Sequence, residues 1–214
     1  MPVFYLFEQP ERVLELTLEH IRLVGISVLA ATLIGVPVGI LCTRIRWLES
    51  PILNLTGILY TIPSLAFFAI LIPYTGLGAS TATIALALYS LLAIIRNTVA
   101  GIDDVPRSTL DAARGMGMTG RQRLFLVELP LAIPVIFAGI RVATVAAVGI
   151  AVIAAVIGAG GLGRLVFDGL RTLDADQVLA GAIMATLLAL AGDWGLKRLG
   201  DALRRDAGAA AERG

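Results

Sequence analysis

The chain has 214 residues, of which 57% are hydrophobic and only 15% are charged. Soluble domains carry about 25% charged residues, so this composition, together with long uncharged runs, indicates a membrane protein. The net charge of +1 and the lack of a basic cluster argue against nucleic-acid binding. A single cysteine and a single histidine exclude an internal disulfide and leave little from which to build a metal site or a membrane-embedded active site.

The lone cysteine and the lone histidine are expected to have ordinary roles. Cys42 suits a small apolar packing residue at a helix end. His20 lies among Glu15, Glu19 and Arg22. These neighbours predict an exposed or interfacial imidazole rather than a metal ligand.

Uncharged runs long enough to cross a bilayer predict an all-α, multi-pass membrane protein. About 20 helical residues cross a core of about 30 Å. The N-terminus lacks the basic start and small-residue cleavage site of a signal peptide, so the first span is expected to be an uncleaved anchor. The membrane domain, about 18–200, is predicted to follow an amphipathic segment at 1–22 and to precede a tail at 201–214. Its five spans are predicted at about 23–43, 51–72, 79–95, 131–157 and 177–195.

Basic residues orient these spans, because arginine and lysine gather on the cytoplasmic side of membrane proteins. Of the 17 basic residues, 12 fall just after the first span, in the loop 96–130 and after the fifth span. This distribution predicts that the loop 96–130 and the C-terminus are cytoplasmic. The N-terminal segment and the loop 158–176 are then expected outside.

The longest polar stretch is DAARGMGMTGRQRLFLVELP, from Asp111 to Pro130. Residues 108–116 favour a helix, which Asp104 or Ser108 is expected to cap. Two alanines in this helix are expected to leave a slim surface that a partner can approach.

Glycine residues are expected to end or bend that helix at Gly115 and Gly117. A second helix is predicted to begin at Thr119, because Gln122 stands three positions later, as in a capping box. Pro130 falls where the fourth span is predicted to start, a position at which proline is tolerated.

This stretch resembles the EAA loop of ABC-importer permeases, which marks the helix that docks on the ATP-hydrolysing subunit. The motif has an acidic residue, two alanines, a glycine and a later Leu-Pro pair. The matching positions here are Asp111, Ala112, Ala113, Gly117, Leu129 and Pro130. Aspartate replaces the glutamate of the motif, which keeps the charge.

Further strings resemble the permease subunits of osmoprotectant importers, which carry glycine betaine, choline, carnitine and related amines. They are TIPSLAFFAILIPYTGLG, LLAIIRNTVAGI, AARGMGMT, VELPLAIPVIFAGIR and IGAGGLG. Methionine-importer permeases share parts of these strings, so a different small solute stays open as an alternative.

The resemblance implies the fold of a type I ABC importer, similar to a methionine permease, in a bacterial inner membrane. It implies a second permease, identical or paralogous, two ATP-binding subunits and an extracytoplasmic substrate-binding protein. This chain is then expected to bind no cofactor and to catalyse nothing, since the partner ATPase uses ATP and Mg.

A further group of residues suits a gate or a transport pathway. Aromatic rings attract quaternary amines through cation–π contacts, a proline inside a span kinks it, and charged groups at membrane depth face protein or water. Arg141 is expected to pair with a carboxylate of the coupling loop. Snorkelling to the interface is the simpler explanation of Arg96. The candidates are Tyr60, Pro63, Tyr89, Arg96, Asn97 and Arg141.

The glycine-rich string Ile157–Gly163 is expected to form a tight turn or a flexible re-entrant segment beside the gate. A phosphate-binding loop is disfavoured, because the string lacks the strand–turn–helix context and the Lys-Ser/Thr pair. The segment after it is predicted to form a short outer helix that meets the binding protein. A secondary transporter or a channel remains the alternative of another class. It is disfavoured because no carboxylate or histidine lies in the middle of a predicted span.

Overall fold

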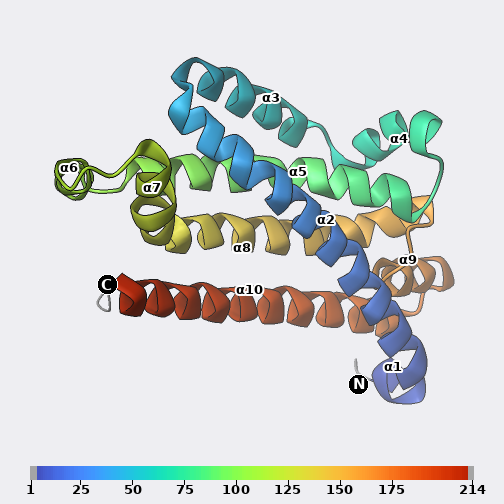
Figure 1. Cartoon of the computed structure of the whole chain (residues 1–214). Helices are drawn as coiled ribbons and strands as arrows, with labels where there is room; N and C mark the ends of the chain where they lie inside the picture. The colour runs from blue at the N-terminus through green and yellow to red at the C-terminus, as the bar shows by residue number, and fades with distance from the viewer. Residues whose placement is uncertain (1–3, 212–214) are drawn as a thin grey trace.

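The computed structural model describes residues 4–211, with side chains for residues 5–203. Every regular element among these residues is helical, which confirms the predicted all-α class. Helices α5 (Ala79–Asp103), α8 (Leu129–Ala154) and α10 (Ala175–Ala211) lie side by side, and α2 (Pro10–Arg44) crosses them (Figure 1). This bundle forms the body from which the loops project.

Helix α2 is longer than the first predicted span. A short helix α1 (Phe4–Glu8) precedes it, and α2 then continues unbroken from Pro10. Val13 and Leu16 are buried in the same core as the later residues of α2. The segment predicted as a separate interfacial element is therefore, from residue 10 onward, the first turns of α2; residues 1–3 lie outside the described residues.

The second predicted span is not one straight helix. Helices α3 (Glu49–Thr61) and α4 (Ser64–Thr75) meet at an angle of 101°, so the kink predicted within the span at 51–72 is a sharp break between two helices. Pro63 stands at the break, and the backbone before it is extended, as proline requires. Residues 4–211 thus contain four helices long and apolar enough to span a membrane, and five spans if the bent pair counts as one.

The helix that contains the fourth span begins before Pro130. It is continuous from α7 (Gly120–Arg123) through a π-helical turn at Leu124–Glu128 into α8. In this wide turn the amide of Leu129 donates to the carbonyl of Leu124. Pro130 has no N–H to donate, and the π turn just before it is one known way in which a helix adjusts its hydrogen-bond ladder.

Arg141 pairs within the bundle rather than with the coupling loop, so that prediction was wrong. Its guanidinium donates to both carboxylate oxygens of Asp193 on α10, at 2.8 and 2.7 Å. Arg141 lies about three turns, or about 18 Å, into α8, which puts it out of reach of the loop. Because α10 packs along α8, Asp193 is its partner.

The remaining helix, α9 (Gly163–Thr172), is short, as predicted for the segment after the glycine-rich string. The predicted tail is not a separate element, because α10 continues to Ala211; residues 212–214 lie outside the described residues. The loop that contains α6 (Arg107–Gly115) lies at the same end as the C-terminal end of α10, whereas the N-terminus and α9 lie at the opposite end (Figure 1). This arrangement agrees with the predicted sidedness.

Candidate coupling loop and transport cavity

Helix α6 is the first helix of the loop that follows α5, and the residue that caps its N-terminus differs from the prediction. Its N-cap is Pro106, and no side chain caps it, so neither Asp104 nor Ser108 has the predicted role. The fixed φ of proline sets the direction of the first turn instead, and the amides of Thr109 and Leu110 donate to the Pro106 carbonyl.

A glycine-dependent turn ends α6. Gly117 has φ +78°, a left-handed conformation that favours glycine. The amide of Met118 donates to the carbonyl of Ala113 at 3.1 Å, and that of Gly117 to Arg114 at 2.9 Å. These two bonds form a Schellman motif with glycine in its usual place, so the predicted role of Gly117 is confirmed.

The two alanines of α6 differ in exposure. Ala113 is buried against the rest of the loop, whereas Ala112 is exposed. The prediction that both present a slim surface is therefore right only for Ala112. Met116 is 70% exposed beside it, and the exposed Asp111 pairs with Arg114 of its own helix at 3.0 Å.

The second half of the loop turns back into the bundle at a capping box. The amide of Gln122 donates to the Thr119 hydroxyl, and the Gln122 side chain accepts from the Thr119 amide, which confirms the prediction. Arg123 donates to the carbonyl of Met118 at 3.1 Å. Leu129 is half-buried and packs against the main core, so the Leu-Pro pair belongs to the root of α8 rather than to the exposed tip.

Two ion pairs hold the base of this loop to the bundle. Arg46, just after α2, makes two hydrogen bonds of 2.7 Å to Asp103 at the end of α5. The carboxylates of Asp103 and Glu49 raise the pKa of Arg46 above its ordinary value. Arg44, the last residue of α2, pairs with Glu128, whose carboxylate is buried in the π turn. The tip of α6 projects beyond this fixed base.

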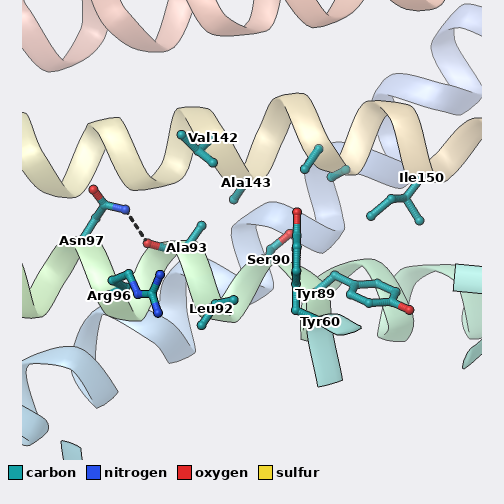
Figure 2. A pocket seen from close by; sticks show the side chains of 12 residues that line it. Tyr60, Tyr89, Ser90, Leu92, Ala93, Arg96, Asn97, Val142, Ala143 and Ile150 are labelled. Carbon is teal, nitrogen blue, oxygen red and sulfur yellow. Dashed lines mark hydrogen bonds between the residues drawn. The ribbon is translucent and has the colours of Figure 1, made fainter. Parts of the chain in front are cut away.

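A cavity of about 250 Å³ opens along α5 and α8, with Tyr60 of α3 closing one side. Figure 2 shows Tyr60 and Tyr89 toward one end and Arg96 and Asn97 toward the other. Four of the six residues predicted for a gate or pathway thus line one cavity. Small and aliphatic residues of α8 complete its wall: Val142, Ala143, Ala146, Ala147 and Ile150.

Tyr89 organises the aromatic end of this cavity. Its ring makes edge contacts with Tyr60 and with Phe67, with centroids 5.9 and 5.2 Å apart. Its hydroxyl donates to the carbonyl of Ile62 at 2.6 Å, in the break between α3 and α4. The sequence did not reveal this bond, because it joins residues 27 positions apart.

The other candidates have clear places. Pro63 forms the break between α3 and α4 and does not line the cavity. The side-chain amide of Asn97 donates to the carbonyl of Ala93 on its own helix at 2.8 Å (Figure 2). Arg96 is exposed and makes no ion pair among the described residues.

The environment of His20 differs from the one predicted from the sequence. It is completely buried and hydrogen-bonded, so the prediction of an exposed or interfacial side chain was wrong. Of the charged neighbours on which that prediction relied, Glu15 and Arg22 are exposed, whereas Glu19 is half-buried and binds the same turn as His20. The partners of His20 come from α8 and the turn after it, which no local pattern indicates.

Comparison with known proteins adds the family. Residues 35–205 match the family described as binding-protein-dependent transport system inner membrane component. The chain belongs to this family. It is therefore a transport subunit of the inner membrane and not an enzyme.

Its relatives are permease proteins. The chain is 46% identical to the osmoprotectant import permease protein OsmW of Salmonella typhimurium, over 92% of this chain and 94% of that protein. It is 42% identical to the choline transport system permease protein OpuBB of Bacillus subtilis, over 83% and 82%. It is also 40% identical to the carnitine transport permease protein OpuCB of Listeria monocytogenes, over 92% and 90%.

A solved structure confirms the predicted fold. An inward-facing form of the MetNI methionine ABC transporter contains a chain that superimposes with a TM-score of 0.81 at 21% identity. The match covers 92% of this chain and 98% of that one. The chain thus has the type I ABC importer permease fold, as predicted.

Proposed function

We propose that this chain moves quaternary-amine osmoprotectants, such as glycine betaine, choline or carnitine, across the membrane in a complex with two ATP-binding subunits, a second permease and an extracytoplasmic binding protein. Support for the solute class comes from the relatives, whose names refer to osmoprotectants, choline and carnitine. The ATP and Mg are used by the ATP-binding subunits, and this chain binds neither.

The observation that carries the coupling role is the shape of α6. The base of the loop that contains α6 is fixed by the Arg44–Glu128 and Arg46–Asp103 pairs, while Ala112 and Met116 are exposed at the tip of that loop. A loop that is fixed at its base and exposed at its tip can transmit a displacement from a partner to the bundle. We assign the tip as the surface that the ATP-binding subunit contacts.

The cavity between α5 and α8 supports a pathway for a small organic cation. Its volume of about 250 Å³ lies below the usual range of sites for drug-sized ligands, about 300–1,000 Å³. Tyr60 and Tyr89 line one end, and the face of an aromatic ring attracts a quaternary ammonium group through a cation–π contact. The cavity is open on one side, where a second permease would complete it.

The decisive experiment is purification of the tagged chain from native membranes in mild detergent, with the bound subunits identified by mass. We expect an ATP-binding subunit and a binding protein to purify with it. The complex in proteoliposomes is then expected to take up glycine betaine, choline or carnitine only when ATP and the binding protein are present. If the complex took up methionine instead, the proposed solute class would be wrong. If uptake did not require ATP, the result would support a secondary transporter.

A further inference from the structure

Two neighbouring side chains of α2 hold the turn that follows α8. The carboxylate of Glu19 accepts from the amide of Gly161 at 2.9 Å, and Nδ1 of His20 accepts from the amide of Leu162 at 3.2 Å. These are consecutive residues on α2 bonded to consecutive residues of a turn more than 140 positions later. The turn, residues 158–162, is called the outer turn below.

His20 uses both of its ring nitrogens. Because Nδ1 accepts from Leu162, the proton lies on Nε2, which donates to the carbonyl of Val148 on α8 at 3.2 Å. The imidazole is completely buried. A buried side chain that accepts at one position and donates at another joins three elements at one point: α2, α8 and the outer turn.

The glycines of the outer turn allow this close approach. A Cβ at Gly160 would lie 2.5 Å from the Glu19 carboxylate, and a Cβ at Gly161 would lie 2.9 Å from Nδ1 of His20. Both glycines have a positive φ, +83° and +74°. The turn is therefore shaped to bring its backbone amides onto these two side chains.

The opposite end of α2 is also attached to the helix that contains α8. Arg44 pairs with Glu128, just before α8, and Glu19 and His20 bind the turn just after it. Helix α2 is continuous over about 37 Å between these two attachments. It is thus a rod joined to α8 at the base of the coupling loop and again at the outer turn.

We propose that Glu19 and His20 are positioning residues that make the outer turn move together with α2, so that a displacement imposed at the base of the coupling loop reaches the outer end of the bundle. This inference rests on the proposed function. Without the two side chains, ATP hydrolysis would continue but would no longer reshape the outer end. The number of solute molecules imported per ATP would then fall.

The test compares His20→Leu with His20→Gln in the complete complex in proteoliposomes, with binding protein and glycine betaine, choline or carnitine. Leucine fills the site without polar atoms, whereas glutamine supplies one acceptor and one donor. We expect His20→Leu to reduce the uptake per ATP by about tenfold, as for the loss of a typical coupling between sites. His20→Gln is expected to stay within about twofold of the wild type.

A second pair of variants decides the question if His20→Leu does not assemble. Glu19 is half-buried and borders an open cavity, so its substitution is compatible with folding. Glu19→Ala removes the acceptor for Gly161, while Glu19→Gln keeps an oxygen in place. Lower uptake per ATP in the alanine variant and near-normal uptake in the glutamine variant support the inference.

The outcomes separate this inference from the proposed function. If the wild-type complex takes up none of the three solutes, the proposed function fails. If it does take one up, and Glu19→Ala and any assembled His20→Leu match it in uptake per ATP, the positioning role is overturned. A loss of complex yield with an unchanged ratio of uptake to ATP would also overturn it, because it would show a purely structural role.

Discussion

The tip of the coupling loop and the outer turn both contain clustered glycines, but the two regions use them differently. In the outer turn and just after it, a Cβ at position 160, 161 or 163 would meet other atoms of the chain within 3 Å. Around Gly115 and Gly117 nothing lies within 4 Å of an added Cβ. Contacts within the chain thus explain why glycine is needed at positions 160, 161 and 163. At the coupling loop, only the positive φ of Gly117 requires glycine. We infer that the space around Gly115 serves a partner.

The largest effect is expected for Gly163→Ala, at the end of the outer turn. Its Cβ would lie 2.0 Å from the carbonyl oxygen of Val152, a backbone atom that cannot turn aside. We expect a loss of more than about 3 kcal/mol of folding free energy, at the upper end for overpacked sites. The measurement is the yield of folded complex after detergent extraction, which is expected to fall sharply.

Gly149→Ala is the matched control, since nothing lies within 4 Å of the added Cβ and alanine favours the helix. A normal yield of Gly163→Ala would mean that the turn can shift. The contrast between the two glycine-rich regions would then fail.

The next effect tests how the base of the coupling loop is held. Arg44→Met leaves the Glu128 carboxylate buried without its partner, which costs about 3 kcal/mol in comparable buried pairs. Glu128→Gln should cost much less, because the 42% exposed Arg44 side chain can reach water. Thermal unfolding of the purified complex compares the two.

Arg44→Lys keeps the charge and serves as the control for the first of these variants. Equal losses in Arg44→Met and Glu128→Gln would show that burial of Glu128 does not set the strength of this attachment.

Gly117→Asp is expected to affect stability modestly and transport strongly. A side chain at φ +78° costs about 1 kcal/mol, and the new charge stands on the surface assigned to the ATP-binding subunit. We expect insertion to persist while co-purification of that subunit and uptake are lost. Gly117→Asn has a similar backbone cost without the charge, so it should retain more uptake. Full ATP-driven uptake by Gly117→Asp would remove the coupling assignment.

The predictable part of this structure followed from local patterns. Charge-free runs predicted the long helices because charged groups avoid the membrane core, and the capping box at Thr119 and the turn at Gly117 were visible in short strings. Contacts between distant segments were not visible. The burial of His20 depends on the turn after α8, and the pairing of Arg141 with Asp193 depends on how α10 lies along α8.

The cavity illustrates the same limit within the candidate site. Composition and position identified Tyr60, Tyr89, Arg96 and Asn97 separately, and the structure brings them together around one cavity. The sharp break at Pro63 was expected only as a kink, because the strength of a bend depends on what holds it. Here the hydroxyl of Tyr89 on α5 donates to the carbonyl of Ile62 at the break and so helps to hold the bend.

The smallest expected effect, that of Gly115→Ala, bears most directly on the difference between the two regions. Alanine in the last turn of α6 should stabilise the helix by up to about 1 kcal/mol, since no atom of the chain opposes it. If a partner lies against this position, the methyl group should still reduce ATP-driven uptake, by about fivefold for a weak coupling. Gly57→Ala, an open helical position in α3, controls for the gain in helix propensity. A more stable loop with lower uptake would show that a partner, and not this chain, requires glycine at position 115. A more stable loop with unchanged uptake would mean that the open space around Gly115 has no occupant.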